Sequence, residues 1–382
     1  MSETLAVRRS RFFDRINETL GQSSAHLLLV THCLADRPEF IDAVSRLVSS
    51  VKIVAIPYSI HEPTIKALSL RYSVSTPSMV ELHDVEFLRD LLECLPNDGP
   101  IVIAEIGGYF APLIANMPEG LQHRVLGVIE DTEAGHRRYL AVRDSLRCAV
   151  VSVARSPLKE PEDSLVGASC VFSVERIVRD LGTVLDAQQC LVIGYGKVGR
   201  GLANHLRDRR LPVSVYDSDP VRRVCALSEG FLVPHRNASI TGADIIFGAT
   251  GNLSMNGNDV SLIRDGALLV SCSSRTQEFD LLSLRAAVKS EVGSSVFEKL
   301  SNESKTFYIA SGGYPINFRD GAVIGPALSL VQAEILAGIS MMANGPPAPG
   351  IHSVPTSVQQ MIAEQWLAEF THIERGSYRR SL

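Results

Sequence analysis

The sequence predicts an α/β protein that contains two doubly wound parallel-sheet domains. Short apolar runs alternate with amphipathic stretches along the chain, a rhythm typical of parallel strands joined by helices. The chain has 382 residues, more than the roughly 250–300 residues at which a single hydrophobic core stops growing. A glycine-rich turn follows an apolar run near the middle of the sequence. These observations favour two domains, each built around its own sheet.

Four apolar runs predict the strands of the first sheet. They are nearly continuous in apolar residues, as expected for strands covered by helices on both faces, and they span residues 26–31, 52–57, 101–104 and 125–129. A helix is expected over 38–48, between the first two strands. A first sheet flanked by helices follows from this order.

A polar stretch over 155–164 interrupts this pattern, and its prolines at 157 and 161 predict a loop or the entry to a helix. Apolar residues then recur at helical spacing over 171–181. The strands expected beyond it are 190–193, 213–216, 244–247 and 267–271, and the last helices are a long apolar one over 327–342 and one near 358–370. We therefore expect one domain over 1–165 with 326–382 and a second over 166–325.

The composition excludes several classes of protein. A net charge of −5 gives no electrostatic reason to expect a nucleic-acid partner. The sequence holds no run of about 18 apolar residues that predicts a membrane span, and its first residues are polar, so we expect a cytoplasmic protein. The seven cysteines are scattered and never form a CxxC pair, which indicates buried, reduced thiols and no metal site.

The strongest motif is the turn Gly194-Tyr195-Gly196-Lys197-Val198-Gly199, which directly follows the strand at 190–193. In such a turn the first glycine permits a tight bend, the second lets a pyrophosphate approach the backbone, and the third lets helix and strand pack closely. The N-terminus of the following helix offers N–H groups and partial positive charge to the phosphates. The pattern predicts a Rossmann domain that binds NAD.

Two further features extend the expected cofactor site. Asp217 ends the next strand about twenty residues on, where a carboxylate accepts hydrogen bonds from a ribose diol and repels the phosphate of NADP. Arg222 and Arg223 lie close to it and make this preference for NAD moderate. Thr250, Gly251 and Asn252 follow another strand and are expected near the nicotinamide-side ribose, with a plain loop as the alternative.

The sequence resembles the S-adenosylhomocysteine hydrolase family. Four stretches carry the resemblance in the order found in that family, and they are residues 127–135 (GVIEDTEAG), 194–201, 216–220 (YDSDP) and 249–251 (ATG). The resemblance implies a substrate domain, formed by the N-terminal part and a C-terminal return, hinged to an NAD domain. It also implies that NAD oxidises the 3′ carbon of a nucleoside ribose, that the 5′ substituent is eliminated, and that water normally adds before the hydride returns.

The resemblance implies roles for particular residues. On the substrate side, His32 corresponds to a histidine that contacts the nucleoside, Asp131 to an acid that holds the ribose hydroxyls, and Asp163 to an aspartate beside the oxidised hydroxyl. On the cofactor side, Thr132 corresponds to a threonine that contacts NAD, and Asn317 to an asparagine near the nicotinamide.

The sequence also departs from the family pattern. Pro161 falls at the position of the family's lysine base, and Lys159, two residues earlier, can substitute only if the loop shifts. Ser274 replaces a histidine, Glu105 and Ile106 precede the glycine pair where the family has an aspartate, and the Gly-His pair before the long helix is missing. These departures put ordinary hydrolysis of S-adenosylhomocysteine in doubt.

Three functions remain open from the sequence. The first is an NAD-dependent enzyme that stops after eliminating the 5′ substituent of a purine nucleoside, as a lyase or dehydratase does. The second is hydrolysis of S-adenosylhomocysteine or a related thioether nucleoside, and the third is a catalytically weak NAD-binding regulatory protein. The long apolar helix over 327–342 suggests a partner surface, so we expect a homo-oligomer with a small nucleoside as substrate.

Overall fold

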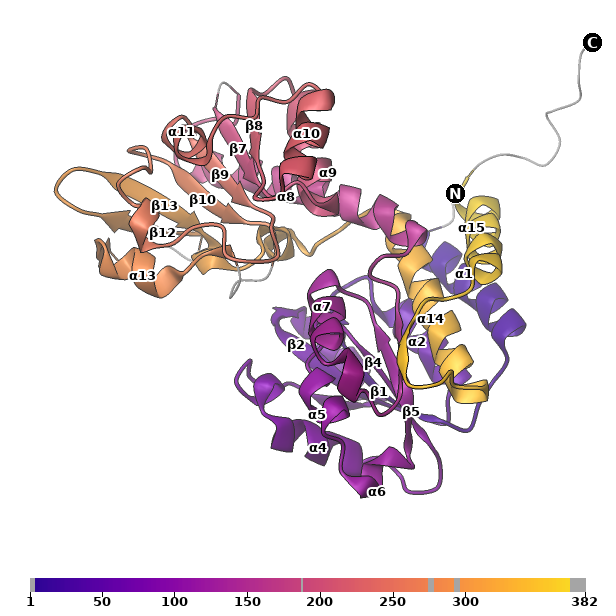
Figure 1. Cartoon of the computed structure of the whole chain (residues 1–382). Helices are drawn as coiled ribbons and strands as arrows, with labels where there is room; N and C mark the ends of the chain where they lie inside the picture. The colour runs from indigo at the N-terminus through magenta and orange to yellow at the C-terminus, as the bar shows by residue number, and fades with distance from the viewer. Residues whose placement is uncertain (1–3, 187, 274–277, 292–295, 372–382) are drawn as a thin grey trace, which may run out of the picture. The chain divides into compact units, whose positions relative to one another are not determined.

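The computed structural model describes residues 4–186, 188–273, 278–291 and 296–371 (Figure 1). The chain forms two compact units: unit 1 is Met1–Lys159 with Gly325–Leu382, and unit 2 is Glu160–Ile324. Each unit contains one seven-stranded sheet in which parallel pairing dominates. The predicted α/β class is confirmed.

The sheet of unit 1 is parallel throughout its described pairs, in the order β14-β6-β5-β4-β1-β2-β3. Its strands are β1 (His26–Cys33), β2 (Ser50–Ile60), β3 (Ser73–Ser75), β4 (Ile101–Glu105), β5 (Val125–Glu130), β6 (Ala149–Ser152) and β14 (Gly350–His352). The sequence predicted the four longest and missed β3, β6 and β14.

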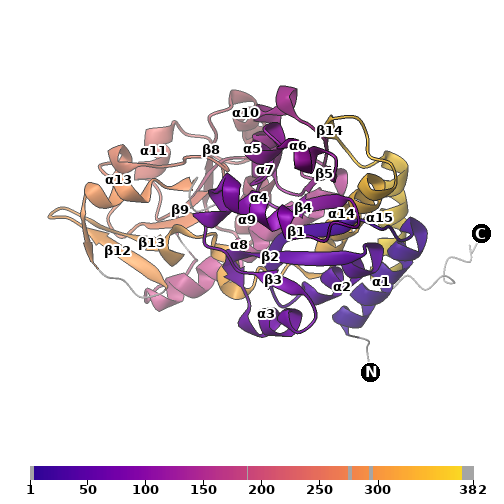
Figure 2. The same ribbon diagram turned by 90° about the horizontal axis from the view of Figure 1, so that it is seen from below.

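Helices cover both faces of this sheet (Figures 1 and 2). One face carries α1 (Leu5–Leu20), α2 (Pro38–Leu47), α14 (Leu328–Asn344) and α15 (Thr356–Phe370). The other carries α4 (Val85–Glu93), α5 (Ala111–Ala115) and α7 (Glu133–Ala141), and the peripheral helices are α3 (Glu62–Ser69) and α6 (Glu119–Gln122). Because side chains alternate along a strand, Leu27 and Leu29 pack on the first face while Leu28 and Val30 pack on the second.

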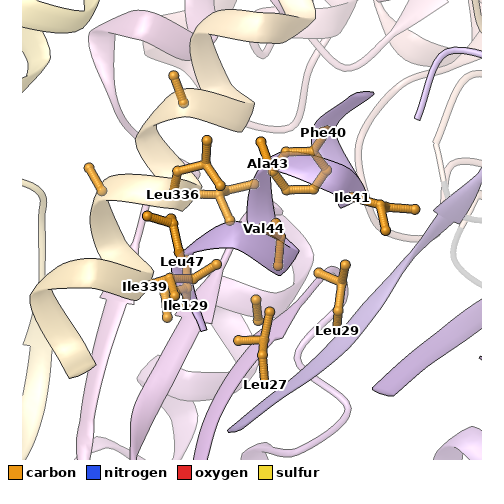
Figure 3. Packing of buried hydrophobic residues seen from close by; sticks show 14 of the residues in the cluster. Leu27, Leu29, Phe40, Ile41, Ala43, Val44, Leu47, Ile129, Leu336 and Ile339 are labelled. Atoms are coloured by element: carbon orange, nitrogen blue, oxygen red, sulfur yellow. The ribbon is translucent and has the colours of Figure 1, made fainter. Parts of the chain in front are cut away.

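The long apolar helix α14 lies in the core of unit 1. Figure 3 shows its Leu336 and Ile339 beside Val44 and Leu47 of α2, over the strand that carries Leu27. By length and composition the helical segment Gly325–Asn344 is apolar enough to cross a membrane, but 72% of its apolar window is buried inside the protein. The interpretation of this helix as a partner surface was therefore wrong, since α1, α2 and α15 already cover it.

The terminal helices of unit 1 are held together by charge. Glu369 of α15 is buried, and Arg8, Arg11 and Arg15 of α1 lie within ion-pair distance of its carboxylate, Arg15 at 3.1 Å. A buried carboxylate that is surrounded by guanidinium groups keeps its charge without a large cost. Glu369 is thus a structural ion-pair centre.

The sheet of unit 2 has the order β11-β12-β13-β10-β9-β7-β8. Its strands are β7 (Cys190–Ile193), β8 (Val213–Tyr216), β9 (Ile245–Gly248), β10 (Leu268–Ser271), β11 (Lys289–Glu291), β12 (Phe297–Ser301) and β13 (Thr306–Ala310). β12 pairs antiparallel with both β11 and β13, which adds an antiparallel edge to a sheet that is otherwise parallel. Short connections explain this, because only antiparallel neighbours can be joined without a crossover helix.

Helices also cover both faces of the second sheet. They are α8 (Glu160–Asp180), α9 (Lys197–Asp208), α10 (Pro220–Ser228), α11 (Arg236–Thr241) and α13 (Leu281–Ala286). The polar stretch is the entry to a helix, one of the two outcomes that its prolines predicted: residues Pro157–Lys159 form a 3-10 turn, η3, and α8 begins at once. Pro161 lies in the first turn of α8, where a helix needs no N–H donor, so the proline starts the helix instead of breaking it.

Five of the seven cysteines are buried, as the sequence indicated, whereas Cys94 and Cys225 are exposed. Both exposed thiols lie near helix C-termini, outside the cores of the two units.

Candidate functional site

The glycine turn of unit 2 lies where the strand order of its sheet reverses. β8 lies on one side of β7 and β9 on the other, and ligands of doubly wound sheets bind at such a point, at the carboxyl ends of the strands. Gly194 adopts φ 101°, which favours glycine, and a Cβ added there would stand 2.5 Å from the Ala249 carbonyl oxygen. A Cβ on Gly199 would stand 1.9 Å from the Gly194 oxygen. Two of the three glycines are therefore required by packing.

Gly196 differs from its neighbours. A Cβ added there would meet nothing nearer than the end of the Arg222 side chain, at 3.5 Å. Gly196 is also the N-cap of α9 and has no side chain to cap the helix. No N-cap side chain therefore accepts from the first N–H groups of α9. The helix starts with Lys197 and Val198, as the sequence predicted. This surface fits a pyrophosphate, which such helix N-termini bind through N–H groups and the helix dipole.

Asp217 is anchored beside the turn. It is buried, one carboxylate oxygen accepts from the Tyr195 N–H at 2.7 Å, and the other accepts from the Asp219 N–H at 2.9 Å. Arg222 lies 3.7 Å from the carboxylate. Each carboxylate oxygen accepts more than one hydrogen bond, so the anchored group retains capacity for a ribose diol. The residues present thus fit NAD.

The loop after β9 is organised by Glu278, a residue that the sequence analysis missed. Glu278 is fully buried, and its carboxylate accepts from the Gly251 N–H at 2.7 Å and contacts the Thr250 hydroxyl at 3.1 Å. Ser254 and Ser273 donate to it as well. Burial raises the pKa of this carboxyl, and the hydrogen bonds oppose that effect.

The turn is closed by its own side chains, since the Asn252 N–H donates to the Thr250 hydroxyl at 2.8 Å. Its role beside the nicotinamide-side ribose stays a prediction, with a plain loop as the alternative.

The other predicted cofactor residues have distinct environments. In unit 2, Asn317 is buried in the 3-10 helix Ile316–Asp320, and the Lys197 ammonium lies 3.7 Å from Asp163 of α8. Thr132 belongs to unit 1, where it caps α7 by accepting from the Gly135 N–H at 3.0 Å. The roles of these residues toward NAD stay predictions. Ser274 lies outside the described residues.

In unit 1 the structure brings together three of the four predicted catalytic residues. The order of its sheet reverses between β1 and β4, and His32 belongs to the carboxyl end of β1 while Asp131 directly follows β5. The Lys159 ammonium donates to Asp131 at 2.8 Å, and both side chains are largely buried, with 9% and 17% of their surfaces exposed. No shift of a loop is needed, because η3 directs Lys159 to the acid. Asp163, the fourth residue, belongs to unit 2.

His32 is held as a neutral imidazole. Its Nδ1 lies 2.5 Å from the hydroxyl of buried Ser59, and that hydroxyl donates to the Ile56 carbonyl at 3.2 Å. The hydroxyl oxygen is then left to accept from Nδ1–H, which assigns the lone pair to Nε2. Burial, then the charges of Arg37 and Lys159, lower the pKa of His32 to about 3. The ring therefore stays uncharged at neutral pH.

Two buried acids support this edge of the sheet. Glu130 accepts from the backbone N–H groups of Gly107 at 3.1 Å, Gly108 at 2.9 Å and Thr132 at 2.6 Å. Glu105 accepts from the Tyr109 N–H at 2.7 Å and from the Tyr139 hydroxyl.

The two acids share one environment. Burial raises the pKa of Glu105 to about 7, and burial together with the charge of Glu105 raises the pKa of Glu130. Because Glu130 directly precedes Asp131 and accepts from the N–H of Thr132, which directly follows it, Glu130 helps to fix where Asp131 lies. The sequence carried a signal for both acids: Glu105 and Glu130 each end a strand, and the pair Gly107-Gly108 follows Glu105 after one residue.

Comparison with known proteins agrees with this geometry. The family model described as S-adenosyl-L-homocysteine hydrolase, NAD binding domain, matches residues 169–321. The chain is 26% identical over 297 residues to S-inosyl-L-homocysteine hydrolase of Methanopyrus kandleri, covering 73% of this chain and 68% of that protein. It is 25% identical over 293 residues to adenosylhomocysteinase of Thermotoga maritima, covering 75% of this chain and 72% of that protein.

A solved structure shares the fold. The putative D-3-phosphoglycerate dehydrogenase of Ralstonia solanacearum superimposes with a TM-score of 0.50 at 12% sequence identity, covering 85% of this chain and 97% of that one. This likeness supports the Rossmann architecture and, at that identity, nothing about the substrate.

Proposed function

This chain is a divergent, NAD-binding member of the S-adenosyl-L-homocysteine hydrolase family, and from that premise we propose that it eliminates the 5′ substituent of a purine nucleoside after transient oxidation at the 3′ carbon. When bound, NAD supplies the acceptor for the hydride of that carbon. The oxidised sugar then loses its acidic 4′ proton, the bond to the 5′ substituent breaks with its electron pair, and the substituent leaves with a proton. Return of the hydride to the 3′ carbon restores the hydroxyl and leaves a 4′,5′-unsaturated nucleoside.

The side chains of unit 1 have matching proposed roles. Lys159 takes the proton of the 3′ hydroxyl as the hydride leaves, and Asp131 accepts hydrogen bonds from the ribose hydroxyls. His32 contacts the nucleoside through its neutral ring. Asp163 of unit 2 remains the predicted neighbour of the oxidised hydroxyl.

The observation that carries this proposal is the buried pair of Lys159 and Asp131 at the reversal point of the first sheet. A base and a hydroxyl acceptor at 2.8 Å, next to a neutral histidine, are the groups that sugar oxidation needs beside a hydride acceptor. A lysine that acts as a base must first lose its own proton, and the Asp131 carboxylate opposes that loss.

The test follows the 4′ hydrogen. Protein loaded with NAD is incubated in D2O with S-adenosylhomocysteine, with S-inosylhomocysteine or with the free nucleosides, and the recovered sugar is analysed by mass spectrometry. The proposal expects deuterium at the 4′ carbon of the recovered substrate and, as a separate product, a 4′,5′-unsaturated nucleoside; both should be lost in Lys159→Met. Wild-type protein that carries NAD and exchanges no 4′ hydrogen with any of these compounds contradicts it.

Hydrolysis of a thioether nucleoside is the second candidate. The names of the relatives favour it, since both are hydrolases of homocysteine nucleosides. Release of homocysteine together with an intact nucleoside in the same incubation identifies this activity. Tight NAD binding with no exchange at any sugar carbon identifies the regulatory alternative.

A further inference from the structure

One acidic residue of unit 1 has no role in the reaction described so far. Glu334 is the single charged residue of α14, whose sequence is otherwise apolar or neutral, and it is fully buried. A buried carboxyl group is costly unless charge or hydrogen bonds compensate it. Its position in the core therefore calls for a reason.

The contacts of Glu334 lead to the turn that carries Lys159. The Gln359 side-chain amide of α15 donates to Glu334 Oε1 at 2.7 Å and to the Ser156 hydroxyl at 3.2 Å. Ser156 in turn accepts from the Leu158 N–H at 3.1 Å and, through its carbonyl, from the Lys159 N–H at 3.1 Å. Two helices of the C-terminal return thus hold η3 through one amide.

Glu334 is not a structural ion-pair centre of the kind that Glu369 provides. Glu369 is surrounded by three arginines, whereas no cation lies within 4 Å of Glu334 among the residues that the structure describes. Glu334 Oε2 is buried and has no hydrogen-bond partner in the same set. A buried carboxylate oxygen without a hydrogen bond costs stability. The ionisation of Glu334 therefore depends on the charges near it.

The charges that act on Glu334 are those of the candidate site. Burial raises the pKa of Glu334, and the hydrogen bonds from Ser156 and Gln359 lower it. The charge of Asp131, after β5, raises it further, and the charge of Lys159 in η3 lowers it. From α15 the facing residue is Gln359, which is neutral. Glu334 and Lys159 therefore influence each other's charge, and the influence is reciprocal.

We propose that Glu334 is a positioning residue that holds the Lys159 turn through Gln359 and Ser156 and sets the pH at which Lys159 releases its proton. The ionised carboxylate favours the ammonium form of Lys159, and the protonated carboxyl does not. Lys159 therefore gives up its proton more readily when Glu334 is neutral. That Lys159 acts as a base rests on the proposed function. The coupling between Glu334 and Lys159 does not.

The experiment measures the proton of Lys159 without turnover. Full-length protein is labelled briefly with acetic anhydride across a pH series, and the labelling of Lys159 is quantified by peptide mass spectrometry. In Glu334→Gln, which removes the charge and keeps the size, the labelling midpoint is expected to fall by about one pH unit. Glu334→Asp, which retains the charge at a greater distance, is expected to give a smaller fall.

Glu369→Gln is the matched control. It removes a buried acid from the same group of helices and is expected to lower the melting temperature while leaving the Lys159 midpoint unchanged. A midpoint identical to wild type in folded Glu334→Gln overturns the proposal, and Glu334→Asp decides the matter in the same way if the glutamine variant does not fold. Because no substrate is present, this result is independent of whether the proposed reaction occurs.

Discussion

Replacing Asp217 with alanine tests the cofactor site most directly. The carboxylate makes two hydrogen bonds to backbone N–H groups, at 2.7 Å to Tyr195 and 2.9 Å to Asp219. Each buried donor left without an acceptor costs about 1–3 kcal/mol, so the variant is expected to lose stability as well as affinity. The lost hydrogen bond from the ribose to a charged acceptor contributes about 1.5–3 kcal/mol, which corresponds to a roughly ten- to 150-fold rise in the Kd for NAD.

The two effects are separated by two measurements. Isothermal titration of the cofactor-free protein gives the Kd for NAD, and thermal unfolding without NAD gives the change in stability. Asp219→Ala is the control, since Asp219 caps α10 by accepting from the Val221 N–H at 2.8 Å and its loss costs about 1 kcal/mol of helix stability. Its Kd for NAD should stay within about twofold of wild type. A folded Asp217→Ala that binds NAD as tightly as wild type refutes the assignment.

Three other predictions concern unit 1. Asp131→Asn should abolish most turnover while NAD content, measured after denaturation, stays at the wild-type level; full turnover in this variant removes Asp131 from the site. His32 should stay neutral over roughly pH 5–8, because its pKa is lowered to about 3, so its ring nitrogen NMR signals should not move in that range. A titration near 6.5 would show that the ring is not buried as described. Glu105 and Glu130 have raised pKa values, so the folded protein binds more protons than the unfolded chain between about pH 4.5 and 7. The contribution of these two groups to stability should therefore be fully present below that window and be lost as pH rises through it. Relative to wild type, Glu105→Gln should lose less stability with rising pH over that range in denaturant titrations; the same dependence on pH in the variant would assign it to other groups.

Local patterns were sufficient to predict the long parallel strands and the glycine turn. A strand buried on both faces must be apolar along its length, and a pyrophosphate turn must carry glycine where a Cβ would collide, as at Gly194 and Gly199. Asp217 was predictable for the same reason, because it lies at a fixed distance along one α/β unit. These features depend on residues close together in the chain.

Other features depended on contacts between distant segments. Lys159 was expected in a loop, and its place beside Asp131 follows from packing of η3 against α14, residues about 170 positions later. Glu278 and Glu334 have no signature in sequence: Glu334 is a single acid among apolar and neutral residues, Glu278 stands in a polar stretch, and neither pattern tells whether the side chain is buried. The antiparallel pairing of β11 with β12 and the burial of α14 likewise depend on tertiary packing, which local sequence patterns do not specify.

The sequence by itself thus determined a glycine turn between parallel strands that fits NAD, because the covalent spacing of strand, turn and helix is enough to form that surface. Only the tertiary structure decided which acids and bases face one another, since burial in a common core determines their charges and chain order does not.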